Sequence, residues 1–133
     1  MLIILSGSSL IEKKSILEIK NNYVKKPLIG INATSAYFEV KNLSDRKVVI
    51  EEINCNEAKR TSFHKILLDE STGTMKMEMM KFIELEPNEE KAFVPMSDHL
   101  MIMGLSPDFG SNNKIECSVL VNQNKTYWSF PLK

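Results

Sequence analysis

The sequence predicts an all-β protein, either an antiparallel β-sandwich or a barrel with Greek-key connections. Three observations lead to this fold class. Short segments of alternating or β-branched residues recur along the chain, turn-forming residues separate them, and no long segment has the 3.6-residue period of an amphipathic helix. About eight to ten such segments in one chain are typical of sandwiches and barrels. A length of 133 residues fits one domain with its own core.

The strands are expected in the following order. Residues 15–25 alternate apolar and polar side chains, and Pro27 and Gly30 end this first strand. The polar residues 54–60 are compatible with a short helical turn. Turn compositions occur at residues 42–45, 71–74, 86–89, 106–113 and 122–124. The remaining strands are expected at residues 35–41, 47–55, 61–69, 75–80, 81–85, 91–95, 99–105, 114–121 and 126–132.

Composition argues against several functions. The 17 basic and 17 acidic residues balance, so nothing indicates binding to nucleic acid or to an anionic membrane surface. No segment approaches the roughly 20 apolar residues of a membrane-spanning helix. The chain has only two histidines, and it lacks a Ser-His-Asp spacing, a phosphate-binding loop and an HExxH motif. We therefore expect neither an enzyme nor a small-molecule substrate.

The N-terminus indicates export. Residues 1–11 are apolar but short, and Leu5-Ser6-Gly7-Ser8 is similar to a lipoprotein cleavage site in which Ser8 stands where the lipid-bearing Cys would be. We interpret residues 1–14 as a signal or anchor remnant or a flexible N-terminus, and residues 15–133 as one folded β-sandwich domain.

Two cysteines, Cys55 and Cys117, lie in segments predicted to be strands. They are too few for a disulfide framework, and the sequence leaves open whether they pair or remain free thiols. A blue-copper site, which needs a Cys thiolate with two histidines, is not favoured. Cys117 has no His or Met after it, and the segment between Cys55 and His64 contains no His or Met.

The methionines have an unusual distribution. Seven of the eight lie in residues 75–103, and both histidines lie in or beside this stretch. Met75, Met77 and Met79 alternate, so they share one face of a strand. Thioethers together with imidazoles suit Cu(I), whereas methionine is also a common filler of irregular cores. From chemistry alone, a Cu(I) site and a methionine-rich core remain equal alternatives.

The predicted hairpin through Gly73 folds His64 back toward Met75 and Met77, and His99 shares a face with Met101. Met103 has the same parity and is a secondary candidate. The expected solvent-facing acids are Asp98 and Glu78, and the methionines assigned to packing or to a second methionine layer are Met80 and Met96.

Here the chain resembles a known family. The segment 99–105, His-Leu-Met-Ile-Met-Gly-Leu, is similar to the His-x-Met-x-Met-Gly-Leu segment of the PCu(A)C-type periplasmic copper chaperones. In that family a Met follows the first His after about ten residues, and 21 residues separate it from the His-x-Met pair. Here 21 residues lie between Met77 and His99, so Met77 matches better than Met75. Twelve residues lie between His64 and Met77, and the longer spacing falls in the predicted turn at 71–74.

The resemblance covers about residues 16–132 and implies a cupredoxin-like β-sandwich that binds one Cu(I). The implied ligands are His64, Met77, His99 and Met101, with Met75 and Met103 as secondary candidates. It also implies a periplasmic location, and the lipoprotein-like residues 5–8 add the expectation that the full-length form is membrane-anchored. The implied partners are the CuA subunit of cytochrome c oxidase and thioredoxin-like copper chaperones. We expect a monomer.

Two other readings use the same residues differently. A metal-free binding or adhesion module would use its methionines only for packing. A copper scavenging or storage protein would use the same site and differ in where the ion goes.

Overall fold

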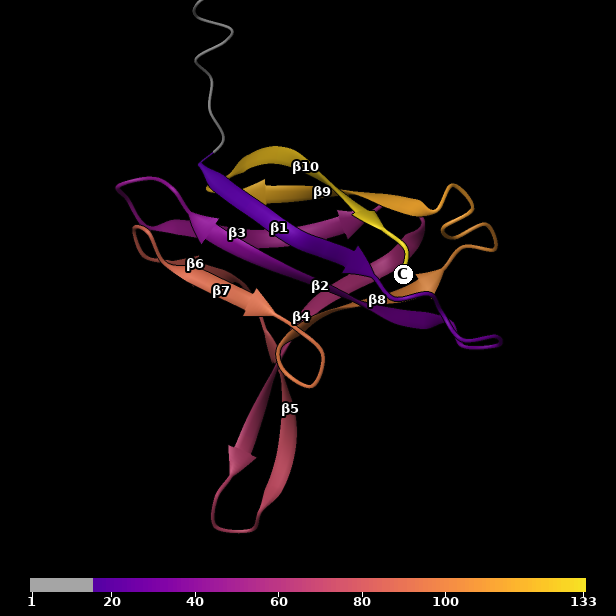
Figure 1. The fold of residues 1–133 in the computed structure, drawn as a ribbon, viewed down its shortest axis with the longest axis horizontal. Helices are drawn as coiled ribbons and strands as arrows, with labels where there is room; N and C mark the ends of the chain where they lie inside the picture. Colours follow the sequence, from indigo (N-terminus) through magenta and orange to yellow (C-terminus); the bar gives the residue numbers. More distant parts are fainter. Residues whose placement is uncertain (1–15) are drawn as a thin grey trace, which may run out of the picture.

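The computed structural model describes residues 16–133, which form ten β-strands (Figure 1). They build two antiparallel sheets, and no helix in these residues is long and apolar enough to cross a membrane. The expected remnant at residues 1–14 lies outside the described residues. The strands are β1 (Leu17–Val24), β2 (Ala33–Asn42), β3 (Val48–Cys55), β4 (Ala58–Asp69), β5 (Thr74–Met80), β6 (Ile83–Leu85), β7 (Glu90–Phe93), β8 (His99–Leu105), β9 (Lys114–Val121) and β10 (Asn124–Pro131).

The larger sheet has the order β1-β2-β8-β4-β5, with β7 pairing β2, and the smaller sheet has the order β10-β9-β3-β6. The predicted all-β antiparallel fold is confirmed. Its strands lie close to the predicted ranges because alternation marks them in the sequence. In β2 every second residue is buried, and β9 repeats this pattern.

The core lies between the two sheets and is built around aromatic side chains. Phe38 stacks on Phe93 within the larger sheet, with ring centroids 4.5 Å apart. Phe38 also meets the edges of Trp128 and Phe130 from the smaller sheet, at 5.5 and 6.0 Å. Such offset and edge contacts between rings add to the hydrophobic stabilisation.

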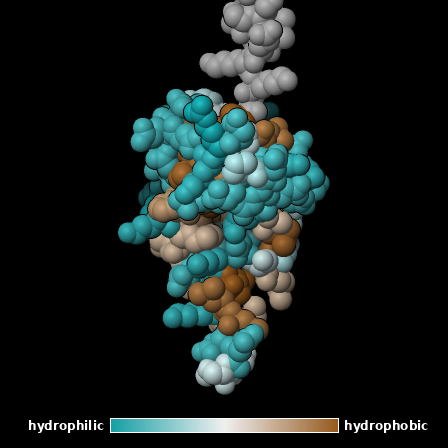
Figure 2. Space-filling view, turned by 90° about the vertical axis from the view of Figure 1, so that its left-hand side faces the viewer, coloured by the Kyte–Doolittle hydropathy of each residue, from teal (hydrophilic) through white to brown (hydrophobic). Residues whose placement is uncertain are grey.

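The β4–β5 hairpin projects beyond the sandwich (Figure 1). Phe63 of β4 is buried and Met80 of β5 packs partly against the core, so the hairpin is anchored at its base. Residues 74–79 are all exposed. Figure 2 shows hydrophobic residues gathered on this projection above a hydrophilic tip.

The structure corrects two expectations about the fold and answers one open question. The helical turn at 54–60 is wrong, because β3 continues to Cys55 and β4 begins at Ala58, with a two-residue turn between them. The open question about the cysteines is answered by a disulfide between Cys55 and Cys117, which are paired residues of β3 and β9. Met96 does not pack. It lies in the β7–β8 loop at a positive φ of 71°, and 86% of it is exposed.

Asn42 connects the two sheets at one end of the sandwich. It is the last residue of β2 and is fully buried. Its Nδ2 donates to the backbone carbonyls of Arg46, Leu85 and Glu86 at 2.7, 3.0 and 3.1 Å. Its Oδ1 accepts from the backbone N–H and the hydroxyl of Ser44 at 2.9 and 2.7 Å. One side chain thus satisfies several buried backbone groups of the loop after β2 and the end of β6.

We predict that Asn42→Ala lowers the free energy of unfolding by about 2–3 kcal/mol, because it leaves these buried groups without partners. Urea denaturation followed by fluorescence would measure the loss. Asn54→Ala is the matched control, since Asn54 is exposed and its side chain bonds the exposed carboxylate of Glu52. Equal stability of the two variants would contradict the role assigned to Asn42.

Candidate functional site

His64 lies at the centre of the candidate site because its strand, β4, runs between β5 and β8. It is paired directly with Met79 on one side and with His99 on the other. Directly opposite residues of antiparallel strands share a face, so the two imidazoles lie together on the outward face of the larger sheet. Their ring centroids are 5.5 Å apart and their planes differ by 26°.

The side chain of Met77 reaches His64 from β5. The Met77 sulfur lies 3.1 Å from Nδ1 of His64, while the other ring nitrogen, Nε2, lies 2.8 Å from the hydroxyl of Ser62. When Nε2 carries the proton, it can donate to that hydroxyl, and the lone pair of Nδ1 then points toward the sulfur. The hairpin therefore folds His64 onto Met77, as the sequence predicts.

His99 begins β8 and is buried, with 8% of its surface exposed. Its Nδ1 lies 3.0 Å from the backbone carbonyl oxygen of Ser97. A carbonyl only accepts hydrogen bonds, so Nδ1 is the nitrogen that carries a proton, and in the neutral ring the lone pair is then on Nε2. Holding one ring nitrogen in this way is how proteins orient histidines that bind metals.

Met101 lies next to this pair of histidines. It is two residues beyond His99 on the same face and is paired with Ser62 of β4 and Ser35 of β2. The Ser35 hydroxyl donates to its sulfur at 3.8 Å. His64 thus contacts both Met77 and His99. Met101 lies on the same face of the sheet, two residues after His99 on β8.

The secondary candidates are further from the histidines along their strands. Met75 is paired with Leu68, toward the tip of the hairpin. Met103 is paired with Arg60, whose guanidinium lies 4.0 Å from the Met103 sulfur. The predicted ligand set omits Met79, although it lies directly opposite His64. Its alternation with Met77 is visible in the sequence, but its position opposite His64 depends on a register that the sequence does not give.

The electrostatics of the site favour neutral imidazole. Burial lowers the pKa of His64 below its usual value, and the proximity of His99 lowers it further, because two imidazolium charges would repel. The two carboxylates next to the site, those of Glu78 and Asp98, form ion pairs with lysines. Glu78 pairs with Lys65 at 3.5 Å on the other face, as expected for a solvent-facing acid.

Asp98 departs from expectation. It pairs with Lys91 at 3.5 Å, accepts from the backbone N–H of Ile66 at 3.2 Å, and only 19% of its side chain is exposed. It therefore helps to hold the start of β8 against β4 instead of facing solvent.

The donors fit a soft metal. In residues 16–133 no three His, Cys, Asp or Glu side chains gather where they could hold an ion. A metal bound at this site must therefore use the methionine sulfurs beside the two imidazoles. Neutral thioethers with imidazole are a donor set that Cu(I) prefers over harder divalent ions.

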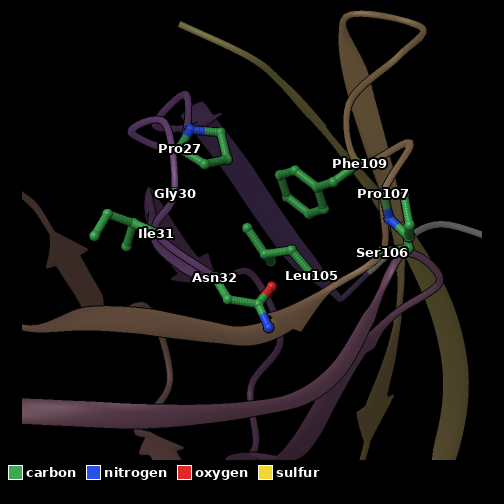
Figure 3. A pocket seen from close by; sticks show the side chains of 8 residues that line it. All are labelled: Pro27, Gly30, Ile31, Asn32, Leu105, Ser106, Pro107 and Phe109. Carbon is green, nitrogen blue, oxygen red and sulfur yellow. The ribbon is translucent and has the colours of Figure 1, made fainter.

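Two surface hollows lie near the loops. One of about 220 Å³ adjoins Met101 and includes Tyr37 and Leu28. The other, of about 340 Å³, lies between the β1–β2 and β8–β9 loops, where Pro27, Leu105 and Phe109 approach one another (Figure 3). The second hollow contains no His, Met, Cys or acidic side chain, so it offers no metal donors of the kind found at His64.

Comparison with known proteins places the chain in a family. A family model described as "Putative lipoprotein LpqE-like" matches residues 17–127. No sequence among curated proteins matches the chain.

Solved structures share the fold. The "Copper-bound PCuAC domain from PmoF2" superposes with a TM-score of 0.73 at 15% identity, covering 90% of this chain and 93% of that domain. The "Apo PCuAC domain from PmoF1" gives a TM-score of 0.71 at 10% identity, with 90% and 94% coverage. Apo-DR1885 from Deinococcus radiodurans gives 0.67 at 16% identity, with 91% and 80% coverage. The chain therefore belongs to the LpqE-like family and has the cupredoxin-like β-sandwich fold of PCuAC domains, which confirms the resemblance drawn from its sequence.

Proposed function

We propose that this protein is a copper chaperone that binds one Cu(I) through His64, Met77, His99 and Met101 and passes it to a partner. The observation that carries the proposal is the contact of the His64 ring with the Met77 sulfur on one side and with the His99 ring on the other. Similarity to a domain solved with copper bound supports the choice of metal.

The donor set suits an ion that must be held and then released. All four groups bind as neutral ligands, and thioethers prefer Cu(I) without competing for protons. Met77 is 53% exposed, so donor atoms of a partner can approach the metal from that side and replace one ligand at a time. We propose transfer of the ion, and no catalytic reaction.

The expected acceptors are the CuA subunit of cytochrome c oxidase and a thioredoxin-like copper chaperone, and the expected location is the periplasm, with membrane anchoring of the full-length form. Two observations support this location. A disulfide such as Cys55–Cys117 persists in oxidising compartments, and the description of the matched family includes the word lipoprotein.

Replacing the sulfurs tests the ligand set. We predict that Met77→Leu and Met101→Leu each weaken Cu(I) binding by well over tenfold while the fold is kept, because Leu is close to Met in volume but has no donor atom. Titration against a competing Cu(I) chelator would measure the affinities.

Met80→Leu is the matched control, because Met80 is paired with the buried Phe63 and lies on the opposite face from Met77. Its affinity should equal that of the unchanged protein. X-ray absorption of the copper complex should show sulfur neighbours. A first shell of nitrogen and oxygen alone would contradict the proposal.

Acid should weaken binding through the histidines. Both imidazoles must be neutral to bind, and the lowered pKa of His64 keeps it neutral to a lower pH than an ordinary histidine. We predict nearly constant affinity above about pH 7 and a loss of at least about tenfold by about pH 5. His64→Met, which keeps a soft donor that does not titrate, should make this pH dependence shallower.

The metal-free protein should show the same direction of change. The pKa of His64 is lower in the folded than in the unfolded state, so folding stability should decrease as pH falls below about 6.5.

The copper titration also has an outcome that contradicts the proposal. Cu(I) affinity that does not change between pH 7 and pH 5 would exclude the imidazoles as ligands.

A further inference from the structure

The outer edge of β5 has no partner strand within residues 16–133. The larger sheet ends at β5, which pairs only with β4. Every residue from Thr74 to Met79 is exposed, and the hairpin extends away from both sheets, so the body of the molecule leaves this edge open (Figure 1). An open edge presents backbone N–H and C=O groups that can pair with another strand.

The two faces of β5 differ in chemistry. One face presents Met75, Met77 and Met79, which are 61%, 53% and 65% exposed. The other presents Lys76 and Glu78, which lie on either side of Met77 in the sequence. A strand of this kind can match itself, because reversing its direction about Met77 exchanges the positions of the lysine and the glutamate.

We propose that β5 pairs antiparallel with β5 of a second copy of this chain, with Met77 opposite Met77, to form a homodimer. In this register Lys76 of each copy lies opposite Glu78 of the other, and Met75 lies opposite Met79. Cross-strand pairs of opposite charge stabilise a sheet, and like charges directly opposite destabilise it.

Charge selects this register from its neighbours. Residues opposite each other in an antiparallel pair must both point their backbone groups either toward or away from the partner, so the register can shift only in steps that keep this match. One such shift places Lys76 opposite Lys76, and the shift in the other direction places Glu78 opposite Glu78. Only the register centred on Met77 puts both charges against opposite charges.

The same pairing brings the exposed sulfurs of the two copies side by side. The methionine faces of the two copies become one continuous surface, because residues opposite each other lie on the same face. Met75, Met77 and Met79 of the second copy then stand beside the same residues of the first, next to the face that holds His64. A dimer of this kind replaces the monomer expected from the sequence.

Sedimentation velocity of the full chain without metal, over a range of concentrations, tests the proposal independently of copper binding. The unchanged protein should dimerise. Lys76→Glu should weaken the dimer by at least about tenfold, because it sets two pairs of like charges against each other and leaves the Lys65–Glu78 ion pair intact. Lys125→Glu, at an exposed position of β10 on the smaller sheet, is the matched control and should leave the dimer unchanged.

Restoring the charges should restore the dimer. The triple variant Lys65→Glu/Lys76→Glu/Glu78→Lys reverses the three charges that pair within the hairpin and across the proposed interface, and so it keeps the pairing both within and between the copies. Its dimer should be as tight as that of the unchanged protein. A chain that remains monomeric at the highest concentrations, or a dimer that Lys76→Glu does not weaken, overturns the proposal.

Crosslinking tests the register. Met77→Cys places two cysteines directly opposite each other, at the Cα separation of about 4.5–5.5 Å that a disulfide can bridge. It should crosslink under mild oxidation, whereas Thr74→Cys, which faces position 80 of the second copy, should not. Crosslinking of Thr74→Cys as readily as Met77→Cys would overturn the proposed register.

Discussion

The pairing register of β4 with β5 and β8 is the constraint on which the candidate site depends. It sets His64 opposite His99 and Met79, and a slip by one residue would turn these side chains toward the core. The register is fixed from the inner face, where Phe63 lies opposite Leu100 and both are buried. Packing inside the sandwich thus determines which donor atoms meet outside it.

The inner face of the larger sheet forms the core, and its outer face carries the candidate site. The inner face holds the aromatic core and packs against the smaller sheet, which the Cys55–Cys117 disulfide crosslinks between β3 and β9. The outer face holds the imidazoles and thioethers. The hydroxyls of Ser35 and Ser62 and the backbone carbonyl of Ser97 orient Met101, His64 and His99, respectively. The two acids nearest the site, Glu78 and Asp98, are each paired with a lysine, so neither leaves an unpaired carboxylate beside the donor atoms.

Much of this arrangement follows from the sequence. Alternation gives the strands, and the resemblance to the PCu(A)C family selects His64, Met77 and His99, which the structure brings together. Other features depend on three-dimensional contacts that no local pattern encodes. Met79 lies opposite His64 because the hairpin loop closes between Asp69 and Thr74, and Asn42 is buried because the ends of two distant strands converge on it. Predicting the disulfide requires knowing that Cys55 of β3 lies opposite Cys117 of β9, and strand alternation does not show which strands are neighbours.

The projecting hairpin has a consequence for how firmly each donor is held. Phe63 and Met80 are its innermost anchors, and beyond them the hairpin has no fully buried side chain. Segments with few buried contacts open at a lower free energy than the core they extend from. Met77 therefore belongs to a segment that can unfold locally, whereas His99 and Met101 lie on a central strand of the larger sheet. The hairpin can then separate the Met77 sulfur from the other donors while the rest of the sandwich stays folded.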